Sequence, residues 1–115
     1  MSELKNRDCI PCQGGVPPLK DDEKKELLKQ LNTQWKLQEG QKRLERKIAL
    51  KDFAEPMKIA QEVAILADEV WHHPELIIRF KELVIRIWTH KIDDLVESDF
   101  IFAAKADEIL KRYQL

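Results

Sequence analysis

Hydrophobic positions along this chain follow two different periods, and the changes between them predict the order of the elements. Spacings of three and four residues, typical of one helix face, recur in three segments: 21–31, 52–71 and 96–113. Alternation of apolar and polar residues predicts a hairpin over 35–50, with Gly40 in its turn. Two runs rich in β-branched residues, 76–80 and 83–89, predict a second hairpin.

The predicted order is therefore helix, strand, strand, helix, strand, strand, helix. An antiparallel four-stranded sheet with about three helices packed on one face is the economical packing for this order, which makes the chain an α+β domain. Residues 1–20 hold two of the three glycines and three of the five prolines and predict an irregular N-terminal arm. The remainder, 21–115, is expected to form one domain with a single core.

Several local expectations follow from the same patterns. Asp21 or Asp22 is expected to cap the first helix, and Val96 or Ser98 stands near the start of the last. Arg46 interrupts the apolar face of its strand, which indicates a frayed or functional position. The second helix is expected to bury a stripe made of Phe53, Met57, Ala60, Ala64, Ala67 and Trp71. It should end near His72, since the residue before Pro74 is pushed out of the α region.

Charge and composition exclude some classes of function. The chain has 20 basic and 21 acidic residues, so a formal net charge of −1 gives no general attraction to nucleic acid or anionic membrane. No apolar run approaches the length of a membrane span, and the N-terminus lacks the apolar segment of a signal peptide. We therefore expect a cytoplasmic protein with no nucleic-acid or membrane partner.

Cys9 and Cys12 form a single CxxC in a stretch rich in proline and glycine. A structural zinc usually needs a second such pair, and a redox motif of the thioredoxin kind lies between a strand and a helix. We interpret the pair as a local loop feature. A metal site completed by a histidine is the alternative.

The chain contains three histidines: His72, His73 and His90. Each can be explained as an ordinary element end, where imidazolium favours a helix C-terminus or lies exposed beyond a strand. All three nevertheless fall at element ends, where sites are usually built, and histidine suits proton transfer near neutral pH. Strand alternation places His90 on the same face as Trp88, whose indole would make a wall for a flat ligand. These residues indicate an acid–base pocket without naming its substrate.

The same residues resemble the pterin-4a-carbinolamine dehydratase family. The shared pattern is D-x3-HHP-x5-F-x9-H-x8-D, running from Asp68 to Asp99, and the flanks "IWTHKIDDLVESDFIFAAKAD" and "CIPCQGGVPPL" are also similar. The resemblance extends over nearly the whole chain. It implies a four-stranded antiparallel sheet backed by helices, assembled into homodimers or homotetramers.

The resemblance also implies a reaction, the dehydration of 4a-hydroxytetrahydropterin to quinonoid dihydropterin, which restores the pterin after aromatic amino-acid hydroxylases have used it. The family needs no metal and no second cofactor. By resemblance, His72 and His90 are the acid–base candidates, and Asp99 anchors the site or orients a histidine. The implied substrate-binding residues are His73, Asp68, Pro74, which holds His73 extended, and Trp88.

Some positions depart from the family pattern. An aromatic residue that many members carry soon after the histidine pair is replaced by Leu76, followed by Ile77 and Ile78, and a common glycine pair is replaced by Asp93 and Asp94. These changes affect the expected contacts to the substrate side chain and the conformation of that loop. Some relatives are cofactors in transcription or assist enzyme assembly, so a non-enzymatic dimerisation, assembly or transcriptional role is the alternative function. A further enzymatic alternative is pterin handling tied to molybdopterin.

Overall fold

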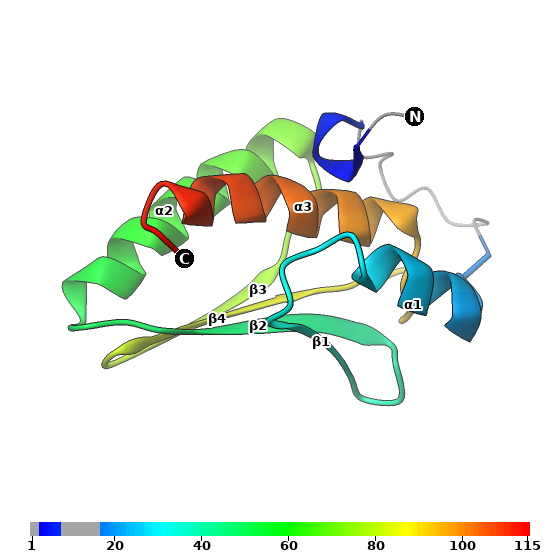
Figure 1. Cartoon of the computed structure of the whole chain (residues 1–115), viewed down its shortest axis with the longest axis horizontal. Coiled ribbons are helices and arrows are strands. Elements are labelled where there is room, and N and C mark those ends of the chain that lie inside the picture. Colours follow the sequence, from blue (N-terminus) through cyan, green and yellow to red (C-terminus); the bar gives the residue numbers. More distant parts are fainter. Residues whose placement is uncertain (1–2, 8–16) are drawn as a thin grey trace.

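The computed structural model describes residues 3–7 and 17–115. Within these residues the chain forms a four-stranded antiparallel sheet with three α-helices and one short 3-10 helix. In chain order the elements are η1 (Leu4–Asn6), α1 (Asp21–Leu28), β1 (Trp35–Gln38), β2 (Arg43–Ala49), α2 (Ala54–Val70), β3 (Glu75–Arg79), β4 (Glu82–Ile87) and α3 (Glu97–Lys111). Figure 1 shows the helices on one side of the sheet, which confirms the predicted α+β class.

The sheet has the strand order β1-β2-β4-β3, and both hairpins join neighbouring strands. The centre of the sheet is the β2–β4 pair, in which Leu44 lies opposite Ile87 and Ile48 lies opposite Leu83. These four side chains are buried against the helices. Because side chains alternate across a strand, Glu45, Lys47 and Arg86 face away from the helices, whereas Arg46 shares the face of Leu44 and Ile48.

The buried side of α2 differs from the prediction. Its buried residues are Pro56, Ile59, Ala60, Val63 and Ala67. Phe53 and Trp71 are 51% and 68% exposed, and Met57 and Ala64 are exposed as well. The predicted stripe was therefore wrong outside Ala60 and Ala67, because the helix turns the neighbouring apolar stripe, with Ile59 and Val63, toward the core.

The start of α1 also differs from the prediction. The N-cap residue is Lys20, and Asp21 and Asp22 lie in the first helical turn. Glu23 accepts a hydrogen bond from the Lys20 amide at 2.9 Å and so satisfies one of the free amides at the helix start. The two aspartates instead place negative charge near the positive end of the helix dipole. For α3, the expected start at Val96 is confirmed by its position as N-cap.

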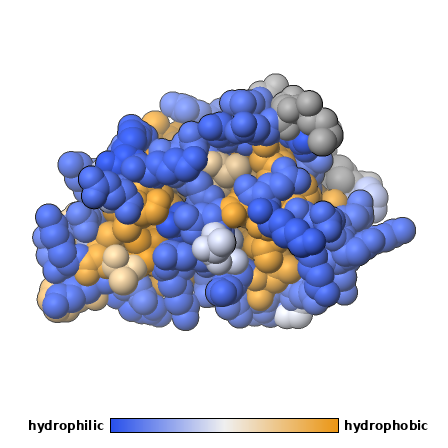
Figure 2. Space-filling model, in the orientation of Figure 1, coloured by the Kyte–Doolittle hydropathy of each residue, from blue (hydrophilic) through white to orange (hydrophobic). Residues whose placement is uncertain are grey.

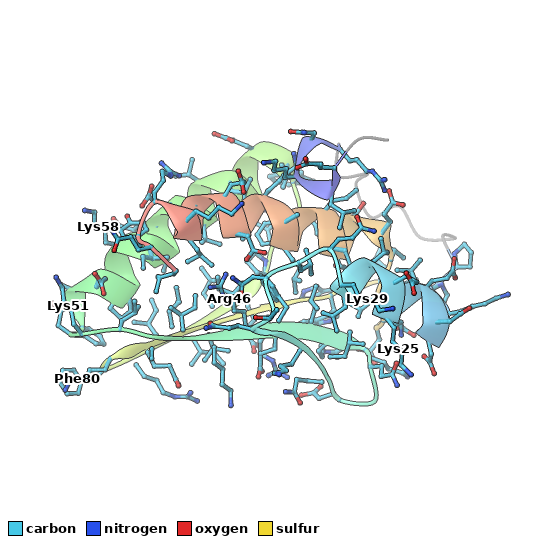
Figure 3. The ribbon with its side chains drawn as sticks, viewed as in Figure 1. Lys25, Lys29, Arg46, Lys51, Lys58 and Phe80 are labelled. Carbon is cyan, nitrogen blue, oxygen red and sulfur yellow. The ribbon has the colours of Figure 1, made fainter. Side chains whose placement is uncertain are left out.

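Arg46 is neither frayed nor exposed. Its side chain is 1% exposed and lies between the sheet and α3 (Figure 3), where it donates a hydrogen bond to Asp107 at 2.7 Å. Asp107 also accepts hydrogen bonds from the Trp35 indole at 2.7 Å and from the Asn32 amide at 3.1 Å. A buried charge is tolerated where it is paired in this way. Arg46 therefore interrupts the apolar face of β2 because it forms a buried ion pair with Asp107.

Residues 3–7 pack against α3. Leu4 is 2% exposed and belongs to the main core. Lys5 binds Glu108 through its ammonium group at 3.2 Å, and its carbonyl accepts a hydrogen bond from Lys105 at 2.9 Å. The division into an arm, 1–20, and a domain, 21–115, stays a prediction. Cys9 and Cys12 lie outside the described residues.

Figure 2 shows hydrophilic residues over most of the face drawn, with apolar residues in gaps between them. In the part of the chain that the structure describes, no helix combines the length and apolar character needed to cross a membrane.

Candidate active site

The end of α2 separates the two adjacent histidines. Trp71 caps the helix in the left-handed conformation, with φ 53° and ψ 47°, and the chain turns sharply there. His72 then points into the protein and is 6% exposed, whereas the His73 side chain is 49% exposed. Pro74 follows and leads the chain into β3 at Glu75.

His72 is held by a buried carboxylate. Its Nε2 lies 2.6 Å from Oδ1 of Asp99, which is fully buried. The other oxygen of Asp99, Oδ2, accepts hydrogen bonds from the Thr89 hydroxyl and from the Val96 amide, both at 2.9 Å. Asp99 thus joins the end of α2, the chain just after β4 and the start of α3. The His72 ring also meets the edge of Phe102, with the ring centroids 6.2 Å apart.

His73 belongs to a second, exposed group. Its Nε2 lies 3.0 Å from Oδ1 of Asp68, one turn back on α2, and the Asp68 side chain is 77% exposed. The indole of Trp71 meets the His73 ring edge to face, with centroids 5.1 Å apart. These contacts hold the ring at the surface beside the buried His72.

His90 belongs to a third group, built on an aromatic stack. Its ring lies parallel to the indole of Trp88, with centroids 4.4 Å apart and planes 15° apart. The guanidinium of Arg43 lies 4.1 Å from the centre of the same indole, and Arg43 is also paired with Asp93. Cation–π contact of this kind stabilises both partners, so Trp88 is fixed and His90 lies against a rigid surface.

The loop that carries His90 is closed at both ends. Thr89 and Asp94 are joined by an isolated β-bridge, with the Thr89 amide donating to the Asp94 carbonyl at 2.9 Å. Asp93 adopts the left-handed conformation with φ 51°, a geometry that aspartate enters less readily than glycine. The Asp94 carboxylate accepts hydrogen bonds from Lys24 and from the Leu95 amide, both at 2.7 Å. Burial alone would raise the pKa of Asp94, but the hydrogen bonds from Lys24 and Leu95 outweigh burial and lower it.

The predicted site residues therefore fall into three contact groups: His72 with Asp99, His73 with Asp68, and His90 with Trp88. Two residues of these groups were not predicted, Thr89 and Arg43. Strand pairing could have indicated Arg43, which lies on the neighbouring strand one position beyond the Leu44–Ile87 pair, beside Trp88. Thr89 follows the end of β4, and no pattern in the sequence indicates its contact with Asp99.

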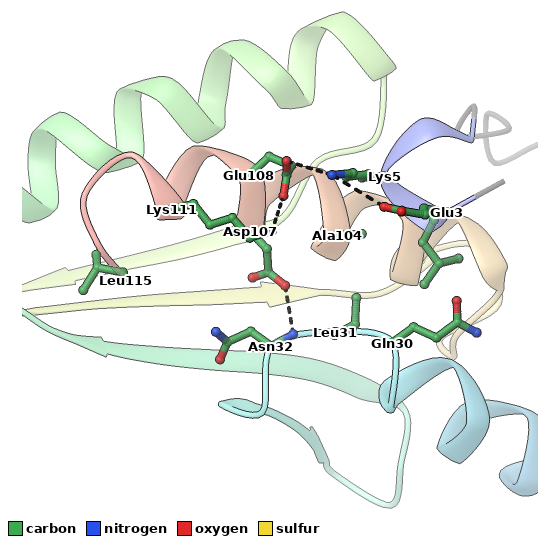
Figure 4. A pocket seen from close by; sticks show the side chains of 11 residues that line it. Glu3, Lys5, Gln30, Leu31, Asn32, Ala104, Asp107, Glu108, Lys111 and Leu115 are labelled. Atoms are coloured by element: carbon green, nitrogen blue, oxygen red, sulfur yellow. Dashed lines mark hydrogen bonds and ion pairs between the residues drawn. The ribbon is translucent and has the colours of Figure 1, made fainter.

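A separate cavity of about 490 Å³ lies between η1, the loop after α1 and α3 (Figure 4). Its charged walls are Glu3, Lys5, Glu108 and Lys111, which pair with one another, and Asp107, which faces the Asn32 amide. None of the predicted site residues lines it. Among the described residues no cluster of three or more histidine, cysteine, aspartate or glutamate side chains is arranged to hold a metal ion.

The arrangement around His72 can move a proton. An ionised carboxylate can only accept hydrogen bonds, so when Asp99 is ionised the Nε2 of His72 carries the hydrogen in this contact. The contact with Asp99 thereby orients the imidazole of His72.

Comparison with known proteins identifies a family for this chain. The family model described as pterin 4 alpha carbinolamine dehydratase matches residues 17–109. A protein of Rickettsia bellii, provisionally named pterin-4-alpha-carbinolamine dehydratase, is 46% identical over 104 residues, which cover 90% of this chain and 91% of the relative. A protein of the same provisional name from Alkaliphilus metalliredigens is 41% identical over 108 residues, covering 94% of this chain and 96% of the relative.

A solved structure is similar as well. The crystal structure of a transcriptional coactivator/pterin dehydratase from Brucella melitensis superposes with a TM-score of 0.74 at 26% identity and covers 81% of this chain and 98% of its own. The matched family model spans most of the chain, including all three histidine groups. This chain belongs to the pterin 4 alpha carbinolamine dehydratase family.

Proposed function

We propose that this protein dehydrates a 4a-hydroxytetrahydropterin to the quinonoid dihydropterin by histidine acid–base catalysis. The observation that carries the proposal is the pairing of His72 with the buried Asp99, in a chain whose family is named for this reaction. We also propose that this reaction recycles the pterin that an aromatic amino-acid hydroxylase uses.

The chemistry requires one proton to be given and another to be taken. The C4a–O bond breaks with its electron pair leaving on oxygen, and a general acid protonates this oxygen so that it departs as water. The lone pair of the adjacent ring nitrogen forms the new C=N bond, and the proton on that nitrogen passes to a general base. The reaction loses one water and involves no oxidation or reduction, so it calls for no redox partner.

The other site residues have supporting roles in this proposal. Trp88 contacts the Arg43 guanidinium and stacks on His90, so in this proposal it orients the His90 ring and lines the pterin site. His73, with Asp68 and Pro74, binds the pterin from the exposed side. His72 and His90 are the proposed acid and base.

The test is stopped-flow absorbance on freshly generated 4a-hydroxytetrahydropterin. We expect the protein to accelerate the decay of this compound above the rate in buffer. His72→Ala and His90→Ala should each lower kcat/KM about 100-fold or more, the usual effect of losing an acid–base group. Lys25→Ala, an exposed change on α1, is the matched control and should retain the wild-type rate.

Two results would contradict the proposal. A wild-type rate equal to the rate in buffer would exclude the dehydratase activity. Full activity in both histidine variants would exclude the histidine mechanism even if the protein were active.

A second candidate is a binding role, because the similar Brucella protein is described as a transcriptional coactivator as well as a pterin dehydratase. The α2 helix exposes Ile65 and Met57, which are 60% and 40% exposed, and such apolar residues suit a contact with another protein. A binding role would tolerate His72→Ala, whereas the dehydratase would not, so the same variant separates the two functions.

A further inference from the structure

We infer that Nδ1 of His72 is the nitrogen that exchanges the proton with the substrate, and that Thr89 is the residue that fixes this choice. Thr89 acts through Asp99 and touches no reacting atom, so it is a positioning residue. The inference rests on the proposed function, and it names the working atom and its support in that same site.

The first step concerns the two nitrogens of His72. Its Nε2 is occupied by Asp99 at 2.6 Å, which leaves Nδ1 as the nitrogen available for proton exchange. Among the described residues, the buried side-chain atoms without a hydrogen-bond partner are Gln41 Oε1, Arg46 Nε and Arg86 Nε. Nδ1 is not one of these atoms, although His72 is only 6% exposed. Nδ1 can therefore exchange a proton with a bound molecule.

The second step concerns the orientation of Asp99. A carboxylate can turn about its own axis unless both oxygens are held. Here Oδ2 is held by the Thr89 hydroxyl and the Val96 amide, both at 2.9 Å, so Oδ1 points at His72. The Val96 amide is fixed by the start of α3, and Thr89 is the only side chain among the described residues with a hydrogen bond to Oδ2.

The third step concerns the position of Thr89. It is 4% exposed and bridged to Asp94, so its hydroxyl has little freedom to turn elsewhere. The next residue is His90. One short segment thus supports His72 through Asp99 and carries the second histidine of the proposed acid–base pair.

The test compares Thr89→Val with Thr89→Ser. Valine has nearly the same shape but lacks the hydroxyl, so we expect kcat to fall about 10- to 100-fold, the effect of losing a hydrogen bond to a charged group. KM should change less than about twofold, since ground-state binding is left in place. Serine restores the hydroxyl and should stay within about threefold of wild type. Thr33→Val, the same change at an exposed loop position, is the matched control and should have no effect.

Nitrogen-15 and proton NMR of the labelled histidines gives a readout that does not depend on activity. In the neutral form, His72 should show an unprotonated Nδ1 and a slowly exchanging proton on Nε2. Thr89→Val should broaden this proton signal, while the His73 and His90 signals stay unchanged and backbone amide spectra confirm the fold. A protonated Nδ1 in neutral wild-type His72 would overturn the inference.

The two proposals fail in different ways. If the wild-type protein does not dehydrate the carbinolamine but the Nε2 proton still depends on Thr89, the proposed function is wrong and the placement of the hydrogen is correct. If the protein is active and Thr89→Val keeps both its rate and its slow Nε2 proton, the function stands and the role of Thr89 is wrong.

Discussion

Asp107 is the residue at which the sheet, the loop after α1 and α3 are joined inside the core. It accepts hydrogen bonds from Arg46, Trp35 and Asn32, and Arg46 is 1% exposed. Such a pair costs desolvation when it forms, but removing one partner leaves the other charged and unpaired in the interior. Loss of the Asp107 carboxylate would therefore destabilise the protein mainly because the Arg46 guanidinium would stay buried without a counter-charge.

We expect Asp107→Asn to lower the free energy of unfolding by about 3 kcal/mol, because the neutral amide leaves the Arg46 guanidinium without a counter-charge. Urea unfolding monitored by tryptophan fluorescence measures this loss. Glu108→Gln, at the next and more exposed position of α3, is the control and should cost less than about 1 kcal/mol. Equal losses in the two variants would contradict this role of Asp107.

At the scale of elements, the loop between β4 and α3 is held by a contact with α1. Lys24 is 3% exposed and donates hydrogen bonds to the Asp94 carboxylate and to the Gln41 carbonyl, both at 2.7 Å. The 90–95 loop, the β1–β2 turn and α1 are thereby tied to one ammonium group. The loop that carries His90 thus depends on a helix distant in the sequence.

We expect Asp94→Asn to destabilise the protein by about 1–2 kcal/mol at pH 7, since the buried Lys24 loses its counter-charge. The pKa of Asp94 lies below its ordinary value of 3.8, so its contribution is complete above that value and is lost as the pH falls through the lower native value. The difference between wild type and variant should therefore shrink as the pH falls from about 5 to about 2.

Thermal or urea unfolding across this pH range measures the effect. Asp93→Asn, at the neighbouring exposed position, keeps the loop geometry because asparagine accepts the left-handed conformation, and it is the control. A difference between Asp94→Asn and wild type that stayed constant down to about pH 2 would contradict the assignment.

At the scale of the whole molecule, the helices cover one face of the sheet and several large apolar side chains remain exposed elsewhere. Figure 3 shows Phe80 at the far end of the β3–β4 hairpin, where it is 68% exposed. Ile65 and Trp71 on and just beyond α2 are 60% and 68% exposed. Exposed apolar surface of this kind is typical of a protein that contacts other subunits.

We therefore expect a homo-oligomer, with a mass two or four times the 13.6 kDa of one chain. Light scattering coupled to size-exclusion chromatography, run over a range of concentrations and at low and high salt, measures the mass. High salt serves as the control, because a contact made by apolar residues persists where charges are screened. A single species of 13.6 kDa under all conditions would contradict the expectation.

Periodicity in the sequence was sufficient to predict the order of the elements and the α+β class. The alternation around Leu44 and Ile48 and the β-branched runs in β3 and β4 leave few other packings. The burial of Arg46 was not predictable, because its partner Asp107 is 61 residues away and looks like an ordinary surface position of a helix. The buried side of α2 was missed for a similar reason, since several apolar faces compete and tertiary packing selects one.

The site shows the same limit. The three histidines at element ends indicated acid–base chemistry, and the resemblance indicated Asp99 and the residue roles. Which histidine is buried depends on the left-handed turn at Trp71, a conformation that a bulky residue rarely adopts and that no local pattern announces. The role of Thr89 depends on a contact across ten residues and a loop, so it becomes visible only when β4 and α3 are placed together.

Asp99 also has a consequence for how this protein can change. Its carboxylate satisfies the Val96 amide at the start of α3 and orients His72 at the same time. Active-site residues are often a burden on stability, so that replacing them strengthens a protein while abolishing its activity. Position 99 offers no such trade-off, because one substitution would weaken the helix start and release the histidine together. Selection for folding alone would therefore preserve this part of the proposed catalytic apparatus, even in a descendant that no longer needed the reaction.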